Sequence, residues 1–490
     1  MASTHPLEIQ EIADLVASHL WSKDVTACIC VCKSWRDSLL PHRWRTVRAG
    51  YTYGFHNIGP SLDAIRSHRY LIQDLLLFGW MDGFCEYLYP NLRSLAFDGT
   101  IGQGKTSRDF ANLIMNTPTL VDLKLTCVDT PPRFWDTLST HPSIKHLSLT
   151  DLKVNVDDSE GLWRVCTKLE SLQMDYVDMD GGCPENVVFG RIRQLQLTAP
   201  NWVRQWVHQW VDYDGMEETH SLADTPYMYL LDLLLQSPML ESLELMIGGD
   251  GFTHEQKVNG DWPHLKRLKI TGRASDAALD FIFKNDLGNM ADLGPHLSEL
   301  NSSKAFGSHY QSLVNVDLRD CLKISGSIVP DILCLCPKLE ILQARHVDAR
   351  NVAERGLWVC QQLRELSIQF LMDPSEQDLQ QLIFERLSTL VLLEQLTLDY
   401  DRDGNGHYDV LDFRLDCGLG QLAGLQQLTS VWLYTPRYSS WGVNLGMEDV
   451  VWMVDNWKKL ATVRGHLNKD AELRFQLECV FESHGISVEL

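Results

Sequence analysis

Two stretches of the sequence have the residue types and spacing of ligand-binding loops. Gly99-Thr-Ile-Gly-Gln-Gly104-Lys105-Thr106 fits the P-loop pattern, in which backbone amides cradle phosphates and a lysine neutralises their charge. Asp401 to Asp412 places oxygen-bearing side chains at the spacing of an EF-hand calcium loop, with Asp412 where a glutamate is usual. What either stretch does depends on the elements that surround it.

The flanking segments favour a structural role for both stretches. Predicted strands begin at residues 92 and 120, which leaves no room for a separate nucleotide-binding domain around Lys105. Residues 393–399 predict a strand, whereas an EF-hand needs a helix there. We therefore expect two turns, and neither a cofactor nor a metal ion. An NTPase that uses Gly104-Lys105-Thr106 is the enzymatic alternative. No nucleophile elbow, zinc-ligand spacing or pair of catalytic carboxylates is evident, so we predict that the protein is not an enzyme.

A repeated L-x-x-L-x-L pattern organises most of the chain. Copies, some with Ile, Val, Phe, Met or Ala at a leucine position, begin at residues 92, 120, 144, 169, 192, 240, 265, 313, 339, 363, 393 and 428, with degenerate end copies at 72 and 460. Most spacings lie between about 20 and 30 residues, the period of leucine-rich repeats. Helical patterns lie between them at 109–116, 328–334 and 377–387. The pattern predicts an α/β leucine-rich-repeat solenoid, a horseshoe whose repeats bury their apolar faces by stacking.

Charge and cysteine usage limit the partners and the compartment. The formal net charge is −22, which argues against nucleic acid or an anionic membrane as the main partner. The N-terminus does not have the pattern of a signal peptide, and no apolar run is long enough to span a membrane. The 13 cysteines form no C-x-x-C pair, so we expect reduced thiols and a cytoplasmic or nuclear protein. Cys166, Cys321, Cys336 and Cys360 are expected to pack inside the repeats.

Residues 4–47 differ from the repeats that follow. Ile9, Ile12, Val16 and Leu20 recur at three- and four-residue steps and predict one apolar helical stripe. After a break at residues 22–24, a second stripe predicts another helix that ends near Leu39-Leu40-Pro41. A helical pair of this size cannot bury so many large side chains alone. It must therefore pack on the repeats or on another protein.

This N-terminal segment resembles an F-box. The resemblance rests on Ile9, Ile12, Leu20 and Lys23-Asp24-Val25, on the most specific run Val31-Cys32-Lys33-Ser34-Trp35, and on the second tryptophan Trp44. The sequence departs from the family pattern at Gln10, where a proline is usual. The order of an F-box followed by leucine-rich repeats is a known family arrangement. Residues 347–366 are similar to filamentous-fungal members of it.

The resemblance implies a domain plan and a partner. Residues 1–48 would be the F-box, 49–70 a connecting segment and 71–490 the solenoid, with insertions near 199–237 and 272–311. The F-box would bind a Skp-type adaptor of an SCF-type cullin–RING ubiquitin ligase, and the repeats would bind a target protein. The implied adaptor contacts are Ile9, Ile12, Leu20, Val25, Val31, Cys32 and Trp35, unless these side chains form only an internal core. A repeat scaffold that acts outside ubiquitination is the remaining alternative.

The solenoid offers two candidate target-binding surfaces. Side chains between the leucines alternate to the open face of the strands and there include Arg267, Lys269, Arg319, Arg345, Trp432 and Tyr434. The four cations suggest an acidic or phosphorylated peptide, unless they are solvated and partly neutralised by Asp317. In the first insertion, Trp202, Trp206, Trp210 and Tyr213 recur at helical spacing, as either core residues or binding anchors.

Overall fold

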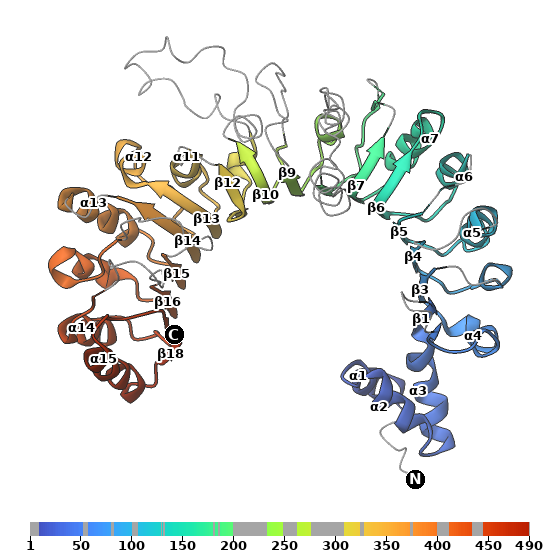
Figure 1. Ribbon diagram of the computed structural model, residues 1–490, viewed down its shortest axis with the longest axis horizontal. Helices are drawn as coiled ribbons and strands as arrows, with labels where there is room; N and C mark the ends of the chain where they lie inside the picture. Colours follow the sequence, from blue (N-terminus) through green and yellow to red (C-terminus); the bar gives the residue numbers. More distant parts are fainter. Residues whose placement is uncertain are drawn as a thin grey trace, which may run out of the picture. The chain divides into compact units, whose positions relative to one another are not determined.

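The structure is a computed structural model of the chain (Figure 1). It describes residues 9–51, 57–79, 83–99, 106–128, 130, 133–179, 182–184, 187–198, 233–247, 262–275, 308–323, 328–372, 376–398, 411–433 and 444–489. The chain divides into two compact units, Met1–Gln236 and Ser237–Leu490, which we call unit 1 and unit 2. Each unit has its own parallel strands and its own buried leucines.

Unit 1 begins with three helices, α1 (Gln10–Ser18), α2 (Ser22–Ile29) and α3 (Lys33–Arg45). The first predicted stripe corresponds to α1, and the second is divided between α2 and α3. Cys32 caps the start of α3, where its sulfur accepts a hydrogen bond from the Trp35 amide at 3.5 Å. The expectation that the second helix ends near Pro41 is wrong, since Pro41 lies inside α3. A proline removes one helical hydrogen bond, and the burial of Leu39 and Trp44 on either side of it offsets that loss.

Parallel strands follow α3 in chain order. Unit 1 contains β1 (Thr46–Tyr51), β2 (Asn57–Ile58), β3 (Asp74–Phe78), β4 (Ser94–Asp98), β5 (Asp122–Thr126), β6 (His146–Val154), β7 (Ser171–Met179) and β8 (Gln194–Thr198). β1 pairs with β3, and each strand from β3 to β8 pairs in parallel with the next. β2 is antiparallel to β1. The helices that connect the strands are α4 (Leu62–His68), η2 (Arg69–Leu71), η3 (Phe84–Glu86), α5 (Thr106–Met115), α6 (Phe134–Ser139) and α7 (Val156–Cys166).

The register places the repeated leucines in one buried row. Leu75, Leu95, Leu123, Leu147, Leu172 and Leu195 are directly paired from strand to strand, and each is at most 2% exposed. Side chains on either side of this row point to the other face of the sheet, because neighbours along a strand alternate. The repeat pattern in the sequence is therefore confirmed as a row of stacked strand–helix units.

Unit 2 repeats this plan. Its strands are β9 (Ser242–Ile247), β10 (Arg267–Ser275), β11 (Asn315–Leu318), β12 (Cys321–Lys323), β13 (Ile341–Asp348), β14 (Glu365–Leu371), β15 (Gln395–Thr397), β16 (Ser430–Trp432), β17 (Thr462–Arg464) and β18 (Ser487–Glu489). From β9 to β18 they are joined in parallel, with β12 continuing beside β10 after a register shift. Cys321, Cys336 and Cys360 are 0% exposed between these repeats, and Cys166 is equally buried in unit 1. This placement confirms the predicted packing role of the four cysteines.

Two helices of unit 2, α11 (Ile328–Leu335) and α13 (Gln377–Ser388), lie at the positions predicted from the sequence. The unit also contains η7 (Ser308–Gln311), α12 (Ala349–Glu354), η8 (Leu415–Cys417), η9 (Leu419–Gly424), α14 (Met447–Asn456) and α15 (Ala471–Ser483). α5, α11 and α13 correspond to the three helical patterns predicted from the sequence. In the repeat between β15 and β16, two short 3-10 helices, η8 and η9, take the place of the α-helices α13 and α14 of the two adjacent repeats.

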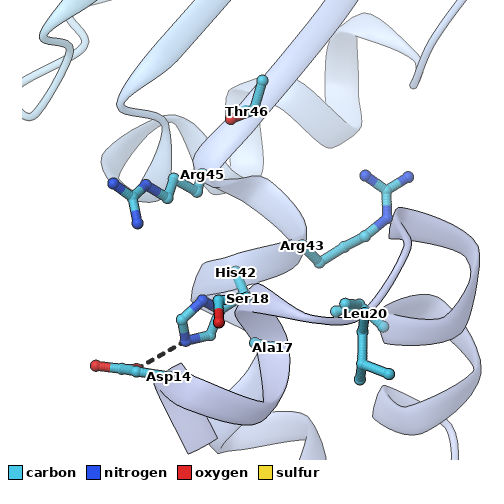
Figure 2. Close-up of a pocket in the computed structure, with 9 residues that line it drawn as sticks. Asp14, Ala17, Ser18, Leu20, His42, Arg43, Arg45 and Thr46 are labelled. Atoms are coloured by element: carbon cyan, nitrogen blue, oxygen red, sulfur yellow. Dashed lines mark hydrogen bonds and ion pairs between the residues drawn. The ribbon is translucent and has the colours of Figure 1, made fainter. Parts of the chain in front are cut away.

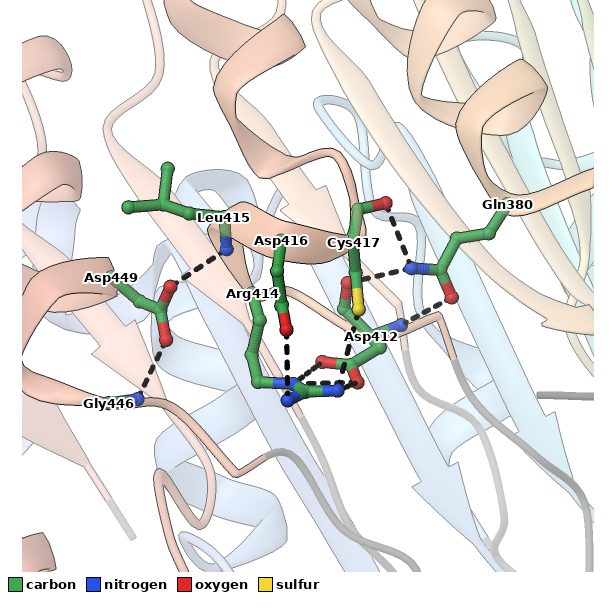
Figure 3. A network of polar contacts seen from close by, with 8 residues as sticks. All are labelled: Gln380, Asp412, Arg414, Leu415, Asp416, Cys417, Gly446 and Asp449. Carbon is green, nitrogen blue, oxygen red and sulfur yellow. Dashed lines mark hydrogen bonds and ion pairs between the residues drawn. The ribbon is translucent and has the colours of Figure 1, made fainter. Parts of the chain in front are cut away.

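Two buried polar side chains hold that irregular repeat to its neighbours (Figure 3). Gln380 on α13 accepts a hydrogen bond from the Asp412 amide and donates to the carbonyls of Asp412 and Cys417. Asp449 on α14 accepts hydrogen bonds from the amides of Leu415 and Gly446. Because no regular helix satisfies the backbone of residues 411–417, these side chains supply part of the hydrogen bonding.

The solenoid begins earlier than the sequence indicated. The predicted connecting segment 49–70 contains the second half of β1 and all of β2 and α4, and the β1–β3 pairing makes it part of the repeat array. The sequence missed this repeat because Val47 and Ala49 supply its buried positions in place of leucine. The predicted insertions lie mostly outside the described residues, which include from them only 233–237, 272–275 and 308–311.

Candidate partner-binding surfaces

Small side chains form the centre of the three N-terminal helices. Ala13 and Ala17 of α1 pack with Val25 of α2 and Leu39 of α3, and all four are buried. Leu20, Cys28, Ile29 and Trp35 pack around them and are partly buried. Alanines on α1 allow the other two helices to approach closely, so the bundle has a core of its own despite its size.

Large apolar side chains are exposed on the same helices and on the residues that flank them. These are Ile9, Ile12, Leu15, Val16, Trp21 and Val31, of which Trp21 is 77% exposed and Val31 is 63% exposed. Ile9, Ile12 and Val16 recur at three- and four-residue steps and so follow one side of α1. Scattered exposed leucines are common on proteins, but this many on three short helices is typical of a surface that another molecule covers.

The seven predicted adaptor contacts fall into three groups by their exposure. Ile9, Ile12, Val31 and Cys32 are exposed, whereas Leu20 and Trp35 are half-buried and pack on the helical core. Val25 is only 4% exposed, so its role is to hold the helices together and it presents almost no surface to a partner.

Leu15 and Trp21 are exposed apolar residues that the motif did not single out. Trp21 comes immediately before α2, and its backbone carbonyl accepts hydrogen bonds from the amides of Asp24 and Val25. A signal was present in the sequence, because a tryptophan next to a helix break has no place on either predicted stripe.

The helices join the repeats without a linker. α3 ends at Arg45 and β1 begins at Thr46, and the Arg45 carbonyl accepts a hydrogen bond from the Gln73 amide. The Trp44 ring stacks on His68 with ring centroids 4.2 Å apart. The Thr46 hydroxyl donates to Asp74. These contacts fix the three helices relative to the first strands of unit 1, and Figure 1 shows α3 leading directly into β1.

The cations predicted to bind a target lie on the open face of unit 2, but several already have partners there. Lys269 forms an ion pair with Glu244 at 2.6 Å. Arg319 makes two hydrogen bonds to Asp317 through its side chain. Arg267 donates to the Ser242 hydroxyl, and Arg345 is half-buried on β13. The structure thus favours the alternative in which these charges are largely neutralised within the repeats.

Of the two aromatic residues predicted to bind a target on this face, the structure describes Trp432. It is 37% exposed on β16 and lies under the guanidinium of Arg464 at 5.4 Å from the ring centre. Arg464 in turn pairs with Glu489 of β18. Tyr434 and the tryptophans at 202, 206 and 210 lie outside the described residues.

The two loop motifs lie almost wholly outside the described residues as well. Of the P-loop-like stretch the structure describes Gly99 and Thr106, the first residue of α5. Of the calcium-loop-like stretch it describes Leu411 and Asp412. The Asp412 carboxylate accepts hydrogen bonds from the Arg414 guanidinium at 2.7–3.0 Å (Figure 3). Both carboxylate oxygens of Asp412, the last residue of the calcium-loop-like stretch, thus accept hydrogen bonds from Arg414.

In the described parts of the chain, no group of three or more His, Cys, Asp or Glu side chains is placed to hold a metal ion. None of the helices in these parts combines the length and the apolar character needed to cross a bilayer.

Thiol reactivity follows from burial. Burial raises the pKa of the Cys360 thiol to about 12 and that of Cys336 well above its usual value. The Cys321 pKa is also raised by burial, and its sulfur donates to the Ile270 carbonyl. Thiolate is the reactive form, so we expect iodoacetamide at pH 8 to label exposed Cys30 and Cys479 at least about 100-fold faster than these three.

Mass spectrometry of peptides after timed labelling checks this prediction, and labelling in guanidinium chloride provides the control for intrinsic reactivity. Equal rates for Cys321 and Cys479 in the native protein would contradict it.

Comparison with known proteins gives likenesses to solved repeat structures. No family model matches the chain, and no curated protein matches its sequence. The chain is 14% identical to the crystal structure of a TLR13–ssRNA13 complex, with a TM-score of 0.45, over 85% of this chain and 57% of that one. It therefore spans just over half the length of that protein. It is 12% identical to an internalin, InlF of Listeria monocytogenes, with a TM-score of 0.36, over 100% of this chain and 98% of that one. At these TM-scores the likeness adds nothing to what the strand pairing shows.

Proposed function

We propose that this protein is a non-catalytic substrate receptor of an SCF-type cullin–RING ubiquitin ligase. In this proposal α1–α3 bind a Skp-type adaptor and the repeats bind a target protein. One observation carries it: large apolar side chains are exposed on helices whose sequence resembles an F-box. The helical core does not include Ile12, Leu15 and Val31, which are exposed, and covering them with a partner would remove apolar surface from water.

The junction between α3 and β1 supports the same function. A receptor subunit has to hold its target at a defined distance from the partner that its helices bind. The stacking of Trp44 on His68 and the hydrogen bond of Arg45 to Gln73 hold the helices against the first strands of unit 1. A partner on the helices would therefore keep a fixed position relative to that unit's sheet.

Binding of a purified Skp-type adaptor tests the proposal. The variant Ile12→Asp/Val31→Asp places two carboxylates on the exposed apolar surface, and we expect it to bind at least about 100-fold more weakly because buried unpaired charge is costly. Both positions are exposed, so the helices should stay folded by circular dichroism. Trp35→Ala is unsuitable, since Trp35 packs on the helical core.

Leu88→Asp/Val188→Asp is the matched control. Leu88 and Val188 are 59% and 63% exposed on the repeats of unit 1, away from α1–α3, and adaptor binding should be unchanged there. Absence of binding by the intact chain, measured by calorimetry, would contradict the proposal. ATP hydrolysis lost in Lys105→Ala would then support the NTPase alternative. Adaptor binding without co-purification of a cullin would favour a scaffold outside ubiquitination.

A further inference from the structure

A cavity of about 330 Å³ lies where the helices meet the repeats (Figure 2). α1 contributes Asp14, Ala17 and Ser18 to its wall, and the last turn of α3 contributes His42, Arg43 and Arg45. Leu20, Val25 and Thr46 complete the lining. The cavity is large enough for one or two side chains of another chain.

The lining combines apolar and cationic side chains. Ala17, Leu20 and Val25 form the apolar part. Figure 2 shows the guanidinium groups of Arg43 and Arg45 on opposite sides of α3. Neither arginine pairs with an acidic side chain within the described part of the chain. Arg43 lies beside the Trp44 ring, at 5.8 Å from its centre.

The single carboxylate in the lining is already engaged. Asp14 accepts a hydrogen bond from Nε2 of His42 at 2.8 Å, which ties α1 to α3 across the cavity. The two arginines therefore dominate the charge that an incoming group would meet.

The positive charge of the N-terminal helices contrasts with the negative net charge of the whole chain. Residues 9–48 carry six Lys or Arg and four Asp or Glu, within a chain whose formal net charge is −22. In the repeats, cations such as Lys269 and Arg319 are paired with acidic neighbours. A basic surface free to attract a partner is thus found at the helices, and not at the strand-face cations that the sequence suggested.

We propose that this cavity receives an acidic segment of the partner that docks on α1–α3. An apolar side chain of that segment would lie on Leu20, and carboxylates on either side of it would meet Arg43 and Arg45. This inference rests on the proposed function and adds an electrostatic contact to the apolar one. The adaptor is accordingly expected to present acidic residues next to its apolar contact surface.

Salt-dependent affinity of the adaptor for the full-length chain tests the inference. We expect Arg43→Gln/Arg45→Gln to raise the adaptor Kd at least about fivefold in 50 mM NaCl, and the difference to shrink in 500 mM NaCl because salt screens the contact. Arg93→Gln/Lys124→Gln is the matched control. It removes the same charge from exposed positions of the unit 1 repeats and should leave the Kd within about twofold.

A second probe is independent of the adaptor. A fluorescein-labelled peptide with the sequence Glu-Asp-Leu-Asp-Glu should bind the wild-type chain and lose binding in Arg43→Gln/Arg45→Gln, whereas Lys-Lys-Leu-Lys-Lys should not bind. Equal adaptor affinity of wild type and the arginine variant at both salt concentrations would overturn the inference and leave the proposed function intact. If the intact chain binds no adaptor, the proposed function and this inference both fail, whatever the peptide does.

Discussion

Gly50→Ala is expected to separate β1 from β3 and to loosen the junction between the helices and the repeats. Gly50 has φ +132°, a conformation that residues with a side chain rarely adopt, and an added Cβ would lie 2.0 Å from the Phe78 carbonyl oxygen. That oxygen belongs to the neighbouring strand and cannot move without breaking the parallel pairing of Gly50 with Phe78. We expect the local free energy of unfolding to fall by more than about 3 kcal/mol.

Hydrogen exchange followed by mass spectrometry measures this effect directly. Peptides that cover Thr46–Tyr51 and Asp74–Phe78 should lose protection in the variant. Gly190→Ala is the control, because its added Cβ meets nothing within 4 Å and its φ is ordinary. It should change stability by less than about 0.5 kcal/mol. Full protection of β1 in Gly50→Ala would contradict the prediction and the strand pairing behind it.

Asp449→Ala is expected to release residues 411–417 from α14. Asp449 is 3% exposed, and its two oxygens accept hydrogen bonds from the Leu415 amide at 2.8 Å and the Gly446 amide at 2.7 Å. The first bond crosses between repeats, and the second caps α14 (Figure 3). Leaving two buried donors without an acceptor should cost about 3 kcal/mol. Asp449→Asn keeps one accepting oxygen and should lose about half as much.

Urea unfolding of the full chain, with exchange protection of residues 411–424 and 447–456 as the local readout, tests this prediction. Asp455→Ala on the same helix is the matched control. The Asp455 side chain is 69% exposed and its ion pair with Lys458 is 3.7 Å long, so its removal should cost less than about 0.5 kcal/mol. Similar losses in Asp449→Ala and Asp455→Ala would show that the Asp449 hydrogen bonds do not stabilise this repeat.

The amino-acid sequence by itself determined the repeat architecture. Buried leucines recur because each strand presents alternate side chains to the core, and each repeat must cover the next. This period is visible in a single unaligned sequence, and so are the helices α5, α11 and α13 between the strands. The first repeat escaped detection because Val47 and Ala49 fill its buried positions, so the leucine pattern was absent while the strand geometry was present.

The partner-binding surfaces depended on the tertiary structure. An amphipathic stripe predicts which side chains of a helix will be covered, but it does not say by what. Packing decides whether such a side chain is buried within its own chain, as Val25 is, or remains exposed for a partner, as Val31 does. The same holds for charge. Lys269 and Glu244 lie 25 residues apart in sequence and meet only because neighbouring repeats are in register. At the cavity beside Arg43, the hydrogen bond between His42 and Asp14 joins the end of α3 to α1. These two residues lie 28 positions apart in the sequence, and no local pattern predicts their contact.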